Sequence, residues 1–263
     1  MKRKMILFLS LLVIISIFCN SCAHSKGVAR DILPRESFIF VNKVLTLYKC
    51  IEDRCVSFNY KSAASAFVVK IEGEGAYAVT AGHVCDDRVP KELQPVRIKS
   101  KYVVQRLDGT KYSASVLTYD MKIDTCLLFI KGLSNFSLLN AGAKAVKMSS
   151  DAPEPGDRIY NIAAPQAIYR PNMVPILEGR FNGNSDGMAW YTLPAAPGSS
   201  GSMIVNGRGE LIGMVHSVFI NFPIITLSTE YEDLKHFINT NVSKFSAYKM
   251  FMKMLGFKDH FHS

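Results

Sequence analysis

Short runs of apolar residues, separated by turn sequences, dominate the middle of this 263-residue chain. Residues 66–71 and 76–80 flank Glu72-Gly73-Glu74-Gly75, a pattern typical of a β-hairpin. The continuous apolar run over 125–130 is typical of a buried strand. Strands at such short intervals, with turn signals between them, predict an all-β barrel or sandwich.

The second half of the chain repeats this pattern. Residues 202–205 and 210–215 flank the turn Asn206-Gly207-Arg208-Gly209, which predicts another hairpin. The spacing changes at 229–239, where apolar residues recur on one face and Thr229 has the character of a helix N-cap. We therefore predict one helix after the last strand.

The segment 241–263 mixes lysines with aromatic and aliphatic residues. One interpretation is a basic amphipathic helix that touches a membrane surface or a partner. The alternative, which we prefer, is an ordinary helix packed on the body or a frayed tail.

The first 22 residues have the pattern of an export signal. Lys2-Arg3-Lys4 precedes an apolar run over 5–18, which is too short to span a bilayer comfortably. The segment is therefore predicted to be a cleaved signal peptide, followed by a linker over 23–35.

Two cleavage sites fit the end of this signal. Ser21 before Cys22 resembles a bacterial lipobox, which would leave Cys22 lipid-modified and attach the chain to a membrane, although Cys19 stands where an aliphatic residue is usual. Alternatively, Ser21 and Ala23 fit ordinary cleavage before His24. We favour the lipoprotein; both predict an exported protein of the cell envelope or periplasm, or a secreted one.

The charge balance excludes one class of partner. Without the signal's three basic residues, 28 basic residues stand against 22 acidic ones, a formal charge of +6. The surplus is spread along the chain without a Lys/Arg block, so we predict no nucleic-acid partner.

Export makes disulfides permissible. Cys50 and Cys55 are close enough for a bridge, but two reduced thiols are equally compatible with the sequence. Cys85 and Cys126 have apolar neighbours, so we expect each to be a small buried residue. Since no Cys/His spacing resembles a zinc site, we predict neither metal nor cofactor.

A serine in a glycine-bracketed loop is the main chemical signal. Gly198-Ser199-Ser200-Gly201-Ser202 lies downstream of His83, in Thr80-Ala81-Gly82-His83-Val84. A serine hydroxyl becomes a strong nucleophile only when a base takes its proton, so this pair indicates acyl-transfer chemistry.

These segments resemble the motifs of trypsin-like (chymotrypsin-fold) serine proteases, especially the bacterial ones. The histidine, aspartate and nucleophile motifs are Thr80-Ala81-Gly82-His83-Val84, residues 120–128 and Gly198-Ser199-Ser200-Gly201-Ser202. Gly156-Asp157, before a strand ending at 163–165, resembles a further family segment. The order His, Asp, Ser is that of chymotrypsin and differs from that of subtilisins and α/β-hydrolases.

The resemblance covers roughly 36–240 and implies a fold. That fold is two six-stranded antiparallel Greek-key β-barrels followed by a C-terminal helix. The expected boundaries are barrel one over 36–140, barrel two over 141–228 and the helix over 229–239.

The resemblance also implies a role for each residue. Ser200 would attack the scissile carbonyl, His83 would take its proton, and Asp124 would hold the imidazole. We prefer Asp124 to Asp120 because the apolar strand begins directly after it. The backbone N–H groups of Gly198 and Ser200 would form the oxyanion hole.

The specificity pocket departs from tryptic relatives. Pro194 lies six residues before Ser200, where tryptic sites have an aspartate, so cleavage after Arg or Lys is not expected. His216 falls on the strand that should wall the S1 pocket, one residue later than in glutamate-specific relatives, and a structural role is favoured. Ser199 and Met203 also depart from the family pattern, but neither removes a catalytic group.

We therefore predict an exported serine endopeptidase that acts on polypeptides. An α/β-hydrolase is excluded because Ser202 occupies the last glycine position of its motif and a hairpin follows. The alternative is a catalytically silent binding module of the cell envelope that keeps the double barrel.

Overall fold

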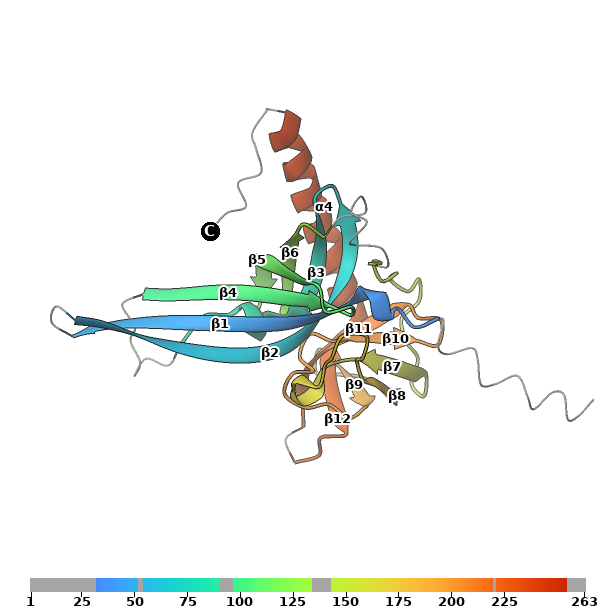
Figure 1. Cartoon of the computed structure of the whole chain (residues 1–263). Helices are drawn as coiled ribbons and strands as arrows, with labels where there is room; N and C mark the ends of the chain where they lie inside the picture. The colour runs from blue at the N-terminus through green and yellow to red at the C-terminus, as the bar shows by residue number, and fades with distance from the viewer. Residues whose placement is uncertain (1–31, 52–53, 90–96, 134–142, 220, 255–263) are drawn as a thin grey trace, which may run out of the picture. The chain divides into compact units, whose positions relative to one another are not determined.

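The computed structural model describes residues 32–51, 54–89, 97–133, 143–219 and 221–254. Its contacts divide the chain into Met1–Leu33 and Pro34–Ser263, and the fold below is that of the second unit. Twelve strands of the described residues form two closed antiparallel barrels of six strands each (Figure 1). The predicted all-β fold is therefore confirmed.

Each barrel is built from six strands that are continuous in sequence. Barrel one has the strand order β1-β2-β3-β6-β5-β4 and barrel two the order β10-β11-β12-β9-β8-β7. The strands of barrel one are β1 (Phe38–Ile51), β2 (Arg54–Glu72), β3 (Gly75–Ala81), β4 (Arg97–Arg106), β5 (Lys111–Asp120) and β6 (Thr125–Lys131). Those of barrel two are β7 (Arg158–Ile162), β8 (Ile176–Ser185), β9 (Met188–Thr192), β10 (Met203–Asn206), β11 (Leu211–Val218) and β12 (Ile225–Thr229).

Alternate residues of the strands fill each barrel. On β1 and β2 the pairs Ile39↔Ala66 and Val41↔Ala64 bring four buried side chains into the core of barrel one. Since successive side chains of a strand point to opposite faces, the odd-numbered residues of this part of β2 face away from that core. Ser65 is one of them, and it is completely buried.

β1, β2 and β4 continue beyond barrel one as a three-stranded ribbon (Figure 1). Exposed Val56, Phe58 and Tyr60 lie along the β2 side of this ribbon. Near the end of the ribbon, Cys55 of β2 is disulfide-bonded. The residue directly opposite it on β1 is Cys50. The bonded state of Cys55 excludes the alternative of two reduced thiols.

The C-terminal helix α4 (Tyr231–Met254) is longer than the predicted one. No glycine or proline interrupts the chain between Thr229 and Met254, so the segment contains no strong helix breaker near Asn239. The expected capping role of Thr229 is wrong, because Thr229 is the last residue of β12 and its hydroxyl donates to the carbonyl of Ile123.

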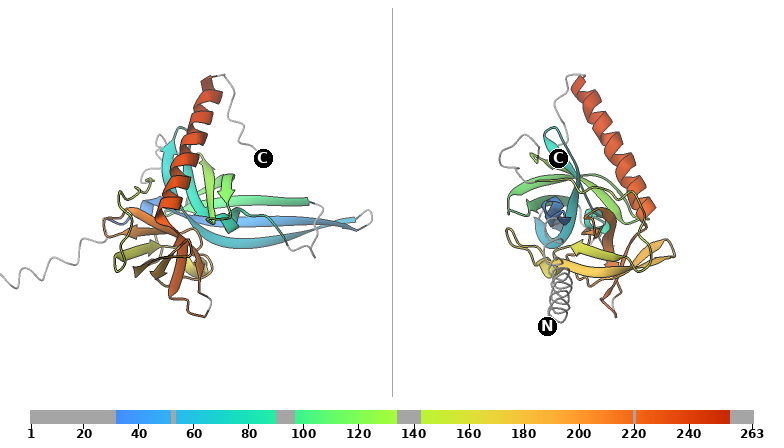
Figure 2. Two further views of the ribbon diagram at one scale, coloured as in Figure 1. Left: turned by 180° about the vertical axis from the view of Figure 1, so that it is seen from behind. Right: turned by 90° about the vertical axis from the view of Figure 1, so that its right-hand side faces the viewer.

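The far part of α4 packs on barrel one. In both views of Figure 2 the helix leaves barrel two and runs along the side of barrel one. Ser246 accepts a hydrogen bond from Lys70 at 3.0 Å and donates to the carboxylate of Glu72. This packing agrees with the preferred interpretation of the tail as far as Met254, and residues 255–263 lie outside the described part. No helix of the described residues is both long and apolar enough to cross a membrane.

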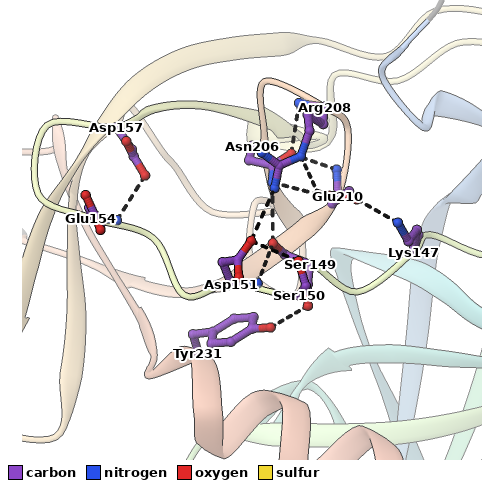
Figure 3. A network of polar contacts seen from close by, with 10 residues as sticks. All are labelled: Lys147, Ser149, Ser150, Asp151, Glu154, Asp157, Asn206, Arg208, Glu210 and Tyr231. Atoms are coloured by element: carbon purple, nitrogen blue, oxygen red, sulfur yellow. Dashed lines mark hydrogen bonds and ion pairs between the residues drawn. The ribbon is translucent and has the colours of Figure 1, made fainter.

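A network of hydrogen bonds and ion pairs holds residues 147–151, in the segment that leads into barrel two (Figure 3). Glu210 accepts from Lys147 and Arg208, both at 2.8 Å, and these contacts, with Asn206, lower its pKa to about 2. The Tyr231 hydroxyl donates to the carbonyl of Ser149 at 2.5 Å. The network thus joins the inter-barrel segment, the β10–β11 turn and the start of α4.

Candidate active site

His83 lies at the point where β3 leaves barrel one. The strand ends at Ala81 and continues into the one-turn helix α3 (Gly82–Cys85), while Ala81 pairs with Thr125 at the start of β6. A Cβ atom on Gly82 would lie 2.9 Å from the amide nitrogen of Thr125 and 3.0 Å from the carbonyl carbon of Asp124. A glycine is therefore required for the close approach that brings His83 to Asp124.

Asp124 uses both carboxylate oxygens on the His83 segment. Its Oδ2 lies 2.8 Å from His83 Nδ1, and its Oδ1 accepts the backbone N–H of His83 at 2.7 Å. The imidazole is 45% exposed whereas the carboxylate is 19% exposed. Asp120, the competing acid, instead accepts the backbone N–H of Lys122. The structure therefore brings His83 together with the preferred aspartate.

A disulfide between Cys85 and Cys126 joins the two segments that carry this pair. Each cysteine lies two residues after a member of the pair, and both cysteines are buried, as predicted. The disulfide between them was not predicted from the sequence. Their equal separation of 41 residues, matching that of His83 and Asp124, was the available signal.

A buried lysine supports the far end of α3. Lys43 Nζ donates to the carbonyl of Asp86 at 2.9 Å and forms an ion pair with Asp87 at 2.8 Å. Asp86 N–H in turn donates to the carbonyl of Gly82. The helix that carries His83 is thus fixed at both ends, by the Asp124 carboxylate and by Lys43.

Ser200 lies in a tight loop against barrel one. The loop is closed by Ser199 N–H donating to Ala196 O and by Ser202 N–H donating to Ser199 O. Gly201 has φ of +80°, and a Cβ there would lie 2.2 Å from both Ser65 O and Thr80 Oγ1. Gly201, the residue after Ser200, therefore lies against β2 and against the end of β3, the strand that leads to His83.

The orientation of the Gly198 N–H follows from its neighbour. Pro197 O accepts the N–H of Gln166 at 2.6 Å. In a trans peptide the carbonyl and the N–H point in opposite directions, so the Gly198 N–H points away from Gln166. Gln166 and Ala167 hold left-handed φ values of 53° and 57°, a conformation that non-glycine residues adopt rarely.

His216, on β11, lies close to Asp124. Its Nδ1 is 3.9 Å from Asp124 Oδ2 and 3.0 Å from Ser217 Oγ, and the side chain is 13% exposed. Burial lowers the pKa of His216, and the nearby Asp124 carboxylate opposes this effect. Pro194 is exposed, and the roles of both residues in specificity stay predictions.

Two cavities, of about 410 and 810 Å³, are lined by residues other than His83, Asp124 and Ser200. Among the described residues, no group of three or more His, Cys, Asp or Glu side chains could hold a metal ion. The predicted lipidation site, Cys22, lies outside the described residues.

The family model and the curated relatives that match this chain all belong to the same class of protein. A family model described as a trypsin-like peptidase domain matches residues 64–214, more than half of the chain. The chain is 30% identical over 164 residues to a probable periplasmic serine endoprotease, DegP-like, of Buchnera aphidicola subsp. Schizaphis graminum (strain Sg), covering 60% of this chain and 30% of the relative. A second DegP-like protein, from B. aphidicola subsp. Baizongia pistaciae (strain Bp), is 26% identical over 201 residues, covering 74% of this chain and 38% of the relative.

Solved structures agree on the fold. The crystal structure of the serine endoprotease from Yersinia pestis matches with a TM-score of 0.58 and 16% identity, over 82% of this chain and 66% of that one. At this identity the likeness shows the fold alone. The chain spans between 30% and 38% of the length of the curated relatives it matches.

Proposed function

The chain belongs to the family of trypsin-like peptidase domains, and we propose that it is a serine endopeptidase that uses Ser200, His83 and Asp124. The observation that carries this proposal is the double contact of Asp124 with the ring and the backbone N–H of His83. A carboxylate on Nδ1 holds the tautomer in which Nε2 is free to accept a proton.

The proposed reaction proceeds through an acyl-enzyme. Ser200 Oγ bonds to the scissile carbonyl carbon while His83 takes the hydroxyl proton, and the carbonyl electron pair moves to the oxygen. When that pair returns, the C–N bond breaks and the imidazolium gives its proton to the leaving amine. Water, deprotonated by His83, then releases the acid product and restores Ser200. The Asp124 carboxylate stabilises the His83 imidazolium in both acylation and deacylation.

The N–H groups of Gly198 and Ser200 are the proposed oxyanion donors. The contact between Gln166 N–H and Pro197 O supports the role of Gly198, because it orients the peptide that carries this donor. Donors that are already oriented need no reorganisation as charge develops on the substrate oxygen, which is why such groups contribute strongly to catalysis.

The location and specificity of the enzyme belong to the same proposal. Both DegP-like relatives are named as periplasmic proteins, which supports export of this chain, with Cys22 as the proposed lipid anchor. Pro194 in place of an acidic residue supports a non-tryptic specificity. The proposed substrates are polypeptides.

A fluorophosphonate probe tests the nucleophile directly. The probe should label the purified wild-type chain and Ser57→Ala, an exposed serine on β2, but not Ser200→Ala. Equal labelling of wild type and Ser200→Ala would refute the assignment. A folded wild-type chain that is neither labelled nor able to cleave a peptide library would instead support the silent binding module.

A further inference from the structure

We propose that Ser65 of barrel one is a positioning residue that holds the oxyanion loop, residues 196–200, in its productive conformation. This inference rests on the proposed function. It starts from the location of the side chain: Ser65 lies on β2 between two residues of the barrel-one core, and its own side chain faces the opposite way. The residue is nevertheless 0% exposed, so its hydroxyl requires hydrogen-bond partners within the protein.

Both partners of the Ser65 hydroxyl belong to barrel two. The hydroxyl donates to the carbonyl of Gly198 at 2.9 Å and accepts the N–H of Ala164 at 3.0 Å. The backbone adds a third link, since Ser65 N–H donates to the carbonyl of Ser200 at 2.9 Å. One residue of barrel one thus holds the first proposed oxyanion donor residue, the proposed nucleophile and the segment that precedes Gln166.

These contacts fix three peptide planes of the loop, and one of them carries the N–H of Gly198. Gln166 N–H fixes the carbonyl of Pro197, and the Ser65 hydroxyl and N–H fix the carbonyls of Gly198 and Ser200. Because the hydroxyl also holds Ala164, it sets the distance between the 164–167 segment and the loop. The contact between Gln166 and Pro197, which orients the Gly198 N–H, depends on that distance.

Removing the hydroxyl should therefore disturb the loop without disturbing the imidazole. The partners of Ser65 and the contacts between His83 and Asp124 share no atoms. Transition-state stabilisation depends on the loop, whereas the rate of proton transfer from Ser200 depends on the His83–Asp124 pair. A residue that only supports folding would not separate these two quantities.

The test compares three full-length variants with wild type. Ser65→Ala removes the hydroxyl, and Ser65→Cys fills the same space with a weak hydrogen-bonding group. Ser149→Ala is the matched control, because Ser149 is also buried and accepts hydrogen bonds from Asp151 N–H and Asn206, but in the network away from the site. The measurements are kcat and KM for a cleaved peptide, inhibition by a peptide boronate, binding of a non-covalent peptide, the pH profile and the thermal midpoint.

We expect both Ser65 variants to lower kcat by roughly 10- to 100-fold, with KM and the pH profile nearly unchanged. Affinity for the boronate, whose tetrahedral adduct uses the oxyanion hole, should fall by a similar factor, while affinity for the non-covalent peptide should not. Ser149→Ala should retain the wild-type kcat even if its thermal midpoint falls.

Two results would overturn the role of Ser65 while leaving the proposed function intact. One is an active wild-type chain whose Ser65 variants keep the wild-type kcat. The other is an equal loss of affinity for the boronate and for the non-covalent peptide, accompanied by a fall in the thermal midpoint. An inactive, unlabelled wild-type chain would overturn the proposed function and this role together.

Discussion

Asp124 can be tested by changing one atom of its carboxylate. Asp124→Asn keeps the volume, but an amide group that accepts from the His83 N–H presents its NH₂ to Nδ1 and thereby favours the wrong tautomer. We expect kcat to fall on the order of 10⁴-fold with a small change in KM. Steady-state peptide hydrolysis measures this loss. Asp120→Asn is the control, since its Oδ1 accepts only a turn N–H, and equal losses in both variants would contradict the choice of Asp124.

The buried position of His216 predicts a pH-dependent stability. Burial lowers its pKa below that of an unfolded histidine, and the proximity of His83 acts in the same direction, against the opposing effects of Asp124 and Ser228. The unfolded chain therefore takes up the proton first as the pH falls. This part of the stability is fully present above about pH 6.5 and is lost as the pH falls through the folded pKa.

His216→Gln should remove this part of the pH dependence. Urea unfolding at pH 7.5 and pH 5 would give a smaller difference in the free energy of unfolding for this variant than for wild type. His236→Gln, an exposed position on α4, should leave the difference unchanged. The same difference in all three proteins would contradict a special environment for His216.

At the residue scale the sequence predicts the residues that belong to motifs, but it does not predict the residues that contact them across the two barrels. His83, Asp124 and Ser200 stand in recognisable local patterns. Ser65 does not, because its partners Ala164 and Gly198 lie 99 and 133 residues away and meet it only when the two barrels pack. No local pattern encodes such a contact.

At the scale of elements, the disulfide between α3 and β6 should stabilise the fold more than it affects the chemistry. Cys85→Ser/Cys126→Ser removes a cross-link that closes a loop of about 40 residues, so we expect the free energy of unfolding to fall by about 2–4 kcal/mol. The hydrogen bonds between His83 and Asp124 involve neither sulfur atom, so kcat well below the unfolding temperature should change by only a few-fold.

Denaturant unfolding and steady-state kinetics on the same preparations measure the two effects. Cys55→Ser, which instead removes the disulfide on the β1–β2 ribbon, is the matched control. A loss of kcat as large as that of Asp124→Asn, in a variant that is still folded, would mean that the disulfide is needed to keep His83 and Asp124 in contact.

The length of α4 shows why element boundaries were less predictable than element types. The polar residues Thr240 and Asn241 interrupt the apolar spacing, so the pattern predicts an end near Asn239. In the structure Val242 is buried, and Ser246 binds Lys70 and Glu72. Contact with barrel one, which local spacing does not reveal, keeps the helix ordered beyond that point.

At the scale of the whole molecule, the proposed site exists only where the two barrels meet. Barrel one contributes His83, Asp124 and Ser65, whereas barrel two contributes the loop with Ser200. The Thr229 hydroxyl, at the end of β12, also reaches across to the carbonyl of Ile123, directly before Asp124. The family resemblance predicted the two barrels, but not the inter-barrel hydrogen bonds that fix their mutual position.

The predicted lipid anchor determines where this site would act. If Cys22 is modified, a cell expressing the whole chain should place it in the membrane fraction, and it should incorporate a labelled fatty acid. Cys22→Ser should abolish the incorporation and move the protein out of that fraction, because a lipidated N-terminus binds membranes through buried acyl chains. Ser25→Ala, in the predicted linker beyond both cleavage sites, is the control, and it should leave both measurements unchanged.

The remaining outcomes separate the two cleavage sites. A wild-type chain without the label, whose N-terminus is His24, would show ordinary cleavage and a soluble exported enzyme. Fluorophosphonate labelling of Ser200 is independent of either result, since the first strand of the barrels begins at Phe38, beyond the linker. An unlabelled N-terminus would therefore refute the anchor while leaving the proposed chemistry untouched.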